Sequence, residues 1–254
     1  MRKAGVLLHI SSLPGEFGCG TFGKWAYAFA DFLAEGGFQI WQVLPFNLPH
    51  RDASPYSSVS TFVQNSLFID PEILCNKNLL TPEEVERLRE EVPQQGREYY
   101  DLAQHRERYL RLAAERAGKS EVREKVSEYI KNSPFVGEAC NYLAKDNPTE
   151  ENRFYYYFLQ YEFYVQWEAL HKYLSERNIE VIGDIPIYVD LHSSEVFHHP
   201  ECFLTDKDGK VSFVSGVPGD DFNDAGQKWN HPLYSTEALA AQNYDLLFDR
   251  MAFA

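Results

Sequence analysis

The sequence predicts an α/β protein built around a parallel sheet, and three observations support this class. Two short apolar runs, residues 5–10 and 38–46, enclose a segment with helical spacing, which makes a strand–helix–strand unit. A third apolar run follows at residues 179–190, after a long helical region. This order favours parallel pairing, because the helix returns the chain to the starting end of the sheet. At 254 residues and 44% hydrophobic content, the chain can form one sizeable core or two small domains.

The first unit has clear boundaries. The run "GVLLHI" ends at "SSLPG", and the helix "KWAYAFADFLAEGG" ends at Gly36 and Gly37. Trp25, Phe29 and Leu33 recur at helical spacing within it, together with Phe32. The second strand, "FQIWQVLPF", ends at Pro45, which cannot donate to a ladder.

A large helical insertion separates the second and third strands. Residues 47–80 form a loop rich in Ser, Pro and Asn, and residues 81–177 have helical patterns throughout. "TPEEVERLREE" begins with Thr81 as the N-cap and with Glu84 three residues later, the pattern of a capping box. The longest predicted helix carries an apolar stripe made of Phe154, Tyr157, Phe158, Tyr161, Val165 and Leu170.

After the third strand we expect a hairpin at 203–216, turning at Asp208-Gly209, and then a long polar loop at 217–234. A further helix starts near residue 236. The chain is therefore expected to divide into residues 1–46 with the first two strands, 47–150 with a rim loop and the insertion, and 151–254 with the third strand.

Charge and cysteine content narrow the function classes. The net charge of −14 disfavours nucleic acid and anionic membranes as partners. The four cysteines are widely spaced without a CxxC pair, so we expect no metal site, and four free thiols fit a reducing compartment. The N-terminal apolar run is too short for a signal peptide. We expect a cytoplasmic protein without a cofactor.

Asp184 is the first candidate site residue, because it interrupts the apolar run "VIGDIPIYVD". An ionised carboxylate inside a buried strand costs several kcal/mol unless it is hydrogen-bonded or paired. Alternation and Pro186 place Asp184 one or two residues inside the carboxyl end of the strand. In a barrel of parallel strands that end carries the active site. The alternative is a structural Asp satisfied by backbone N–H groups.

Two loops are expected to reach the same end of the sheet. "HRDASPYSSVSTF" follows the second strand and presents Tyr56, and "GVPGDDFNDAGQKWNHPLY" follows the third with Asp220, Gln227 and Trp229. Aromatic faces pack on the C–H groups of sugars while polar side chains bind the hydroxyls. A single Trp in a loop more often anchors the loop by hydrophobic packing than it binds a sugar. The combination favours a carbohydrate ligand.

Six blocks in order resemble the N-terminal half of the amylomaltases, the 4-α-glucanotransferases of glycoside hydrolase family 77. They are "GVLLHISSLPGEFGCGTFG", "WQVLPF", "SPYSS", "QWEALHKYLSERNIEVIGDIPIYV", "GVPGDDF" and "GQKWNHPLY". The resemblance implies the first three strands of a (β/α)8 TIM barrel, with the large helical insertion between strands 2 and 3. It implies transfer of α-1,4-glucan segments between maltooligosaccharides by a retaining double displacement.

On this resemblance, Asp184 lies near the cleavage subsite, and Tyr56 and Trp229 contact the glucan. Residues 216–226 match a mobile loop over the acceptor side. Ser54, Asp220 and Gln227 complete the expected substrate-binding set. Some positions depart from the family pattern: "WNHPLY" has Asn230 and His231 where Gly and Asn are usual, and "GVPGDDF" has Gly219 where Pro is usual.

The family's nucleophilic Asp and acid/base Glu belong to later motifs that do not occur in these residues, so no catalytic residue is assigned. We expect the missing C-terminal half of the barrel as a partner, and the chain alone to be inactive and prone to aggregate. Two alternatives stay open. One is a glucan-binding remnant without turnover, and the other is a different barrel enzyme that uses Asp184 and Asp220.

Overall fold

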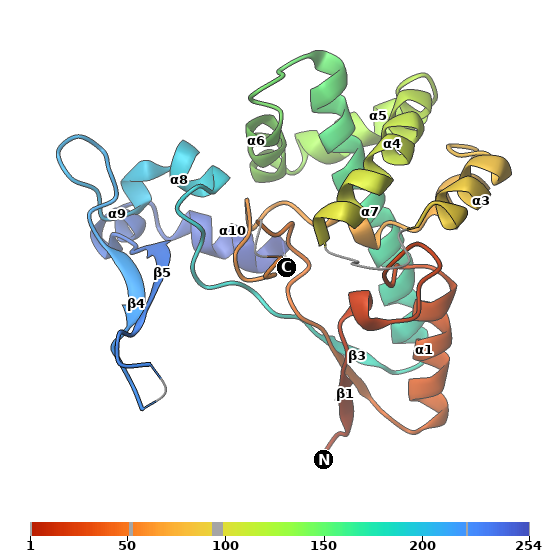
Figure 1. Ribbon diagram of the computed structural model, residues 1–254, viewed down its shortest axis with the longest axis horizontal. Helices are drawn as coiled ribbons and strands as arrows, with labels where there is room; N and C mark the ends of the chain where they lie inside the picture. The colour runs from red at the N-terminus through yellow and green to blue at the C-terminus, as the bar shows by residue number, and fades with distance from the viewer. Residues whose placement is uncertain (1, 51–52, 93–98, 222, 254) are drawn as a thin grey trace. The chain divides into compact units, whose positions relative to one another are not determined.

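A computed structural model of the chain describes residues 2–50, 53–92, 99–221 and 223–253 (Figure 1). The chain forms two compact units. The first consists of residues 1–44 and 64–184, and the second of residues 45–63 and 185–254. The three segments expected from the sequence, 1–46, 47–150 and 151–254, follow chain order and stay a prediction.

The first unit contains a parallel sheet of three strands in the order β1-β2-β3, as the sequence predicts. The strands are β1 (Gly5–Leu7), β2 (Ile40–Gln42) and β3 (Glu180–Ile182). Each is much shorter than its apolar run. A 3-10 helix, Ile10–Ser12, follows β1, and the prolines after β2 and β3 cannot donate to a ladder. Regular pairing therefore stops early.

The two faces of this sheet differ in burial. Trp41 on β2 is 1% exposed, and its ring lies 4.9 Å from that of Phe29 on α1 (Lys24–Glu35). On the opposite face, Leu7 and Ile182 align with Gln42 and are 55% and 45% exposed. Helix α1 itself buries Ala26, Ala30 and Leu33. The rings of Trp25 and Phe32 on the same helix are 43% and 58% exposed.

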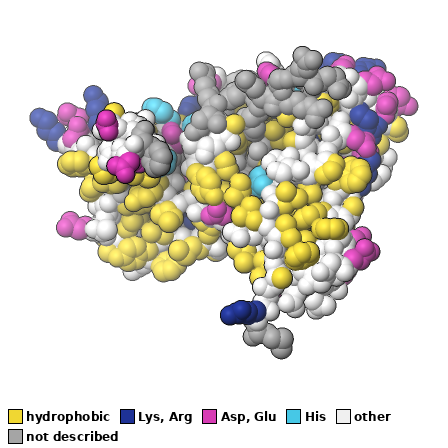
Figure 2. Space-filling view, turned by 60° about the horizontal axis from the view of Figure 1, so that its bottom comes forward, with side chains coloured by type: hydrophobic (Ala, Val, Ile, Leu, Met, Phe, Trp, Pro, Cys, Tyr) yellow, Lys and Arg dark blue, Asp and Glu magenta, His cyan; other side chains and the backbone are white. Residues whose placement is uncertain are grey.

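Hydrophobic side chains cover broad areas of the surface in Figure 2. The exposed apolar residues of the first unit include Leu7 and Ile182 on the sheet, and those of the second unit include Ile187, Phe248 and Met251. Such areas normally contact other protein or ligand. These exposed apolar residues are consistent with the expectation that the chain alone is prone to aggregate, which stays a prediction.

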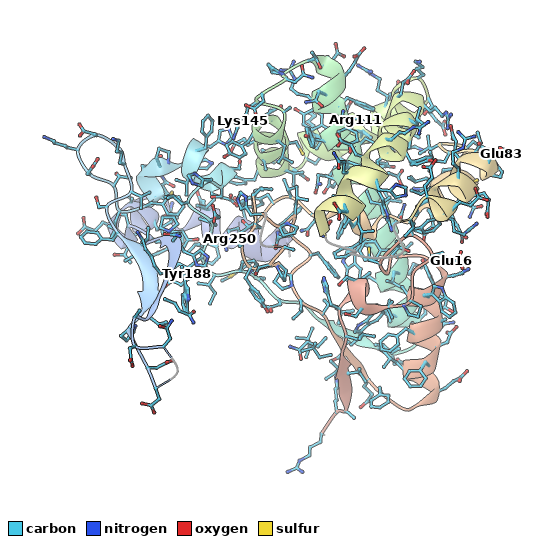
Figure 3. The ribbon with its side chains drawn as sticks, viewed as in Figure 1. Glu16, Glu83, Arg111, Lys145, Tyr188 and Arg250 are labelled. Carbon is cyan, nitrogen blue, oxygen red and sulfur yellow. The ribbon has the colours of Figure 1, made fainter. Side chains whose placement is uncertain are left out.

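Six helices lie between β2 and β3 in the described part of the chain. They are α2 (Pro71–Asn76), α3 (Pro82–Glu90), α4 (Tyr99–Gly118), α5 (Val122–Lys131), α6 (Pro134–Leu143) and α7 (Glu150–Glu176). Figure 3 labels Arg111 on α4 and Lys145 just after α6. The predicted capping box is confirmed: the Thr81 side chain accepts from the Glu84 N–H, and Glu84 accepts from the Thr81 N–H.

Helix α7 buries a different face from the predicted stripe. Of that stripe only Phe158 and Leu170 are buried. The buried face also contains glutamines: the Gln166 side chain accepts from the Asp70 N–H at 2.7 Å, and the Gln160 side chain accepts from the Gln64 N–H at 2.7 Å. These amides satisfy backbone donors of an irregular segment, which explains their burial.

The glycine-rich segment after β1 packs tightly against the insertion. A Cβ at Gly20 would lie 1.9 Å from the Ile10 carbonyl oxygen, and one at Gly23 would lie 1.9 Å from Asp70 Oδ2. Only glycine fits at such close approaches. Much of the motif "SSLPGEFGCGTFG" therefore serves packing.

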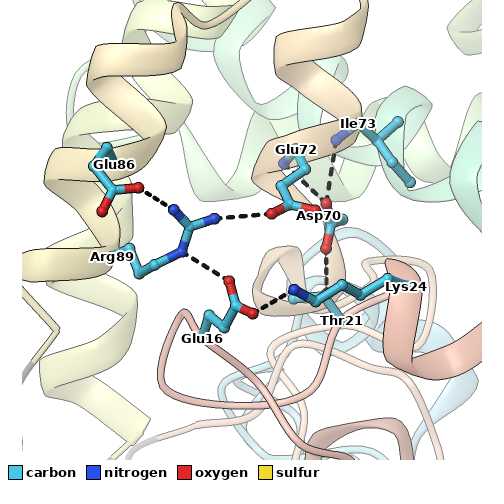
Figure 4. A network of polar contacts seen from close by, with 8 residues as sticks. All are labelled: Glu16, Thr21, Lys24, Asp70, Glu72, Ile73, Glu86 and Arg89. Atoms are coloured by element: carbon cyan, nitrogen blue, oxygen red, sulfur yellow. Dashed lines mark hydrogen bonds and ion pairs between the residues drawn. The ribbon is translucent and has the colours of Figure 1, made fainter.

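Polar contacts fix the same region (Figure 4). Asp70 is the N-cap of α2 and accepts from the Thr21 hydroxyl at 2.5 Å. Arg89 on α3 donates to Glu16 and to Glu72, both at 2.8 Å, and Glu16 also pairs with Lys24 on α1. These contacts join α1, α2 and α3 around one guanidinium.

The second unit contains a two-stranded antiparallel ribbon, β4 (Val214–Val217) with β5 (Gln227–Pro232), and the helices α8 (Ser194–His198), α9 (Thr236–Ala241) and α10 (Asp245–Phe253). The predicted turn at Asp208-Gly209 is present, closed by a Thr205–Val211 bridge. The prediction that residues 217–234 form only a loop is wrong. Residues 227–232 form a strand that pairs with β4, although most of their side chains are polar.

Candidate functional site

The carboxyl edge of the parallel sheet carries two polar side chains. Because parallel strands end at the same edge, the residues after β1 and after β3 share that edge. These are His9 and Asp184. The prediction that Asp184 lies inside the strand is wrong: β3 ends at Ile182 and Asp184 follows it, partly exposed. Its carboxylate therefore avoids the desolvation that a strand interior would impose.

His9 was not predicted from the sequence. Its ring lies edge-on to Phe68, with the ring centroids 5.2 Å apart. Burial lowers the pKa of His9 to about 4, so the imidazole is neutral near pH 7. The signal that identified Asp184, a polar residue at the end of an apolar run, also applies to His9.

The loop after β2 presents Ser54 and Tyr56 in the second unit. The Ser54 hydroxyl accepts from the Tyr56 N–H at 3.3 Å, and the Ser54 carbonyl accepts from the Ser57 N–H at 3.1 Å. This turn leaves the Tyr56 ring 42% exposed. The predicted exposed aromatic is confirmed.

One carboxylate of the second unit, Glu195, holds this loop by hydrogen bonds, and a second, Asp190, lies close to its start. Glu195 on α8, 2% exposed, accepts from the Thr61 N–H at 2.6 Å, the Thr61 hydroxyl at 2.5 Å and the Ser60 hydroxyl at 3.2 Å. Asp190 lies 3.5 Å from Nε2 of His50 at the start of the loop. Glu195 gave no sequence signal, because a Glu in a short polar helix is ordinarily exposed.

The β4–β5 ribbon carries the remaining predicted residues. On β5, the Trp229 indole N–H donates to Gln227 Oε1 at 3.1 Å, and the indole is 46% exposed. Asp220 lies in the turn between the strands, where its carboxylate accepts from the Asn223 N–H at 2.9 Å. Gln227 therefore orients Trp229, while Asp220 stabilises its own turn.

The predicted residues thus form three local groups. Ser54 and Tyr56 share one turn, Gln227 and Trp229 share a hydrogen bond, and Asp184 belongs to the first unit. These groups describe a class: an α/β protein with a polar strand-end edge in one unit and, in the other, exposed aromatic rings beside hydrogen-bonding groups. An exposed ring beside a hydrogen-bonding group, as at Tyr56 and at Trp229, by itself suits a polyhydroxyl ligand.

The family model described as 4-alpha-glucanotransferase, glycoside hydrolase family 77, matches residues 8–147 and 137–254. The chain belongs to this family. The resemblance found in the sequence motifs is therefore confirmed.

Individual relatives agree with the family model. The chain is 37% identical to a 4-alpha-glucanotransferase of Aquifex aeolicus, over 93% of this chain and 53% of the relative. It is 31% identical, with a TM-score of 0.91, to the amylomaltase of Streptococcus agalactiae solved with acarbose, over 98% of this chain and 56% of that one. The amylomaltase of Corynebacterium glutamicum has a TM-score of 0.78 at 19% identity, which shows the shared fold. The chain spans about half the length of the relatives it matches.

Among the described helices, none combines the length and the apolar character needed to cross a bilayer.

Proposed function

We propose that this chain is the glucan-binding N-terminal part of a 4-α-glucanotransferase that acts on maltooligosaccharides and α-1,4-glucans. Two observations carry the proposal: the family membership, and the exposed Trp229 that Gln227 orients. The acarbose bound by the Streptococcus agalactiae amylomaltase supports a glucan-like ligand.

In a retaining double displacement, one carboxylate attacks the anomeric carbon and a second carboxyl group protonates the leaving oxygen. The second group then deprotonates the acceptor hydroxyl. The motifs that supply both groups in the family do not occur in this chain, so its own residues bind and orient the glucan. Asp184 accepts hydrogen bonds from sugar hydroxyls, and the rings of Tyr56 and Trp229 pack on C–H faces. Ser54, Asp220 and Gln227 provide further hydrogen-bonding groups.

The three-stranded sheet is, in this proposal, part of a (β/α)8 barrel. One face is covered by helices, as on the outside of a barrel, and the other exposes Leu7 and Ile182 where a barrel interior would lie. Strands β1 and β3 form the two edges of the sheet. The relatives are about twice as long, and further strands would cover this face.

We also propose a cytoplasmic location and no nucleic-acid or membrane partner. The four free thiols fit a reducing compartment, and the net charge of −14 opposes phosphate-rich surfaces. A non-catalytic glucan-binding protein is the second candidate, because the binding residues are present without the family's catalytic motifs.

Calorimetric titration of the chain with maltoheptaose and with acarbose tests the proposal. We expect saturable binding, weakened at least tenfold by Asp184→Asn and by Trp229→Ala. Trp25→Ala is the matched control, because Trp25 on α1 is 43% exposed, close to the 46% of Trp229. Absence of binding, or an equal loss in the control, would contradict the proposal. A maltotriose disproportionation assay then separates the enzyme from the non-catalytic protein.

A further inference from the structure

A row of aromatic rings in the second unit continues beyond the predicted site residues. The His231 ring on β5 stacks with Tyr188, with centroids 6.0 Å apart and planes 16° apart. Tyr188 stacks in turn with Tyr234 at 6.2 Å and 15°, and Tyr234 with Phe203 at 5.1 Å and 27°. At these separations nearly parallel rings are offset. Phe203 at one end of the row is 2% exposed, whereas Tyr188 is 38% exposed.

The strand geometry brings His231 to this row. The pairing of β4 with β5 shifts register between Val214 and Gly216, and Asn230 has a φ of +60°. Such a bulge bends a strand and redirects its side chains, and bulges are frequent beside functional sites. It lies between Trp229 and His231, so both rings belong to one short irregular segment.

The inner end of the row is held firmly. The Tyr234 hydroxyl donates to the Ile187 carbonyl at 3.0 Å and accepts from Arg250 on α10 at 2.6 Å. Arg250 is 3% exposed and also donates to the Pro186 carbonyl. Figure 3 labels Tyr188 and Arg250 in this unit. The backbone that carries Tyr188 is therefore anchored, which lowers the ordering cost of a ligand that binds there.

The row is accessible away from Phe203. Tyr188 is 38% exposed, His231 is partly exposed, and Trp229, two residues before His231 on β5, is 46% exposed. The turn between β4 and β5 carries Asp220, Asp221 and Asp224, which disfavour an anionic ligand. Ring faces that carry a phenol hydroxyl or belong to an imidazole match a neutral polyol, whose rings alternate C–H faces and hydroxyl edges.

We propose that Tyr188 and His231 form an additional glucan-binding platform, which extends the Trp229 position and favours longer α-1,4-glucans. This inference rests on the proposed function. It adds two binding residues that the sequence analysis did not select. The platform contributes when the glucan is long enough to reach past Trp229.

The test compares maltotriose and maltoheptaose affinities, measured by calorimetry, for the unaltered chain, Tyr188→Leu and His231→Asn. We expect each variant to weaken maltoheptaose binding about five- to thirtyfold and to change maltotriose binding less than threefold. Tyr188→Phe keeps the ring and should bind within threefold of the unaltered chain. Phe213→Leu is the control, because Phe213 is 62% exposed in the same unit but outside the row.

Thermal unfolding midpoints show whether a variant loses affinity through a lost contact with the glucan or through a less stable fold. Unchanged maltoheptaose affinity in Tyr188→Leu and His231→Asn would overturn the platform and leave the proposed function intact. An equal loss for both sugars with a lowered midpoint would also overturn it, because the rings would then serve only packing. If the unaltered chain binds neither sugar, both the platform and the proposed function fail.

Discussion

At the scale of single residues, His9 combines an edge position on the sheet with a ring that is largely but not fully buried. Burial disfavours the imidazolium and lowers the pKa of His9 to about 4 in the folded chain. In the unfolded chain the ordinary pKa is about 6.5. As the pH falls below that value, the unfolded state binds a proton that the folded state excludes, so the folded state loses stability.

We therefore expect the free energy of unfolding to fall between pH 6.5 and pH 4, by at most about 3 kcal/mol from His9. Urea unfolding at pH 7 and at pH 4.5, for the unaltered chain and for His9→Gln, measures this. The variant should show a shallower pH dependence, because glutamine does not titrate. Parallel pH profiles of the two proteins would contradict the assignment to His9.

Arg106 on α4 shows how one buried side chain organises backbone. It is 1% exposed and donates to the carbonyls of Leu67, Ile69 and Phe17 at 2.8, 3.1 and 3.0 Å. Burial lowers the pKa of its guanidinium. These carbonyls belong to segments without regular structure or with a short 3-10 helix. The guanidinium therefore supplies the hydrogen-bond donors that backbone N–H groups supply in a regular helix or sheet.

Replacing Arg106 by Met leaves three buried carbonyls without these donors. We expect the free energy of unfolding to fall by about 3 kcal/mol or more. Arg108→Met, an exposed position on the same helix, should change it by less than about 0.5 kcal/mol. Denaturant titration of both variants gives the comparison, and equal effects would refute a special role for Arg106.

At the scale of elements, the glycine-rich segment after β1 owes its composition to close packing. A Cβ at Gly23 would lie 1.9 Å from Asp70 Oδ2, whereas one at Gly183 would meet nothing within 4 Å. Gly23→Ala must displace the N-cap of α2, and we expect a loss of about 2 kcal/mol or more. Gly183→Ala should be neutral or slightly stabilising. Thermal melts of the two variants test this, and similar midpoints would count against it.

The order of the three parallel strands and the helical insertion between the second and third could be predicted from the sequence. The helix α2 inside the predicted loop 47–80, the extents of the elements and their side-chain environments could not. Apolar runs and the stops at Gly36 and Pro45 locate the strand–helix–strand unit, while the length of a strand depends on its partners. Strand β5 was not predicted, because most side chains of "QKWNHP" are polar. Its pairing with β4 depends on tertiary contacts that the local sequence does not show. The buried face of α7 was misplaced because Gln160 and Gln166 bind distant backbone.

Some residues of the candidate site could likewise be predicted from the sequence, and others could not. Exposed aromatics beside turn residues identify Tyr56 and Trp229, and a polar residue ending an apolar run identifies Asp184. Glu195 and the ring stack of Tyr188 could not be found, because their contacts join segments that are far apart in the chain. Long-range contacts of this kind leave no local pattern in the sequence.

At the scale of the whole molecule, the exposed sheet face has a consequence in solution. Leu7 on β1 and Ile182 on β3 both align with Gln42 and expose apolar surface. Both strands are edges of the sheet that the described residues form, and exposed apolar faces with open edges promote association. We expect concentration-dependent self-association in sedimentation velocity, reduced in the double variant Leu7→Thr/Ile182→Thr. Phe197→Ser, which removes a 63% exposed ring on α8, is the control. A chain that stays monomeric at all concentrations and unfolds cooperatively would contradict this expectation.

The most direct test of the central claim pairs glucan binding with glucan transfer in one preparation of the 254-residue chain. Calorimetry with maltoheptaose measures binding, and release of glucose from maltotriose measures transfer. We expect saturable binding that depends on Asp184 and Trp229, with no glucose released. Release of glucose would show that the catalytic carboxylates lie within these residues, and absence of binding would show that the family's glucan site is not formed here.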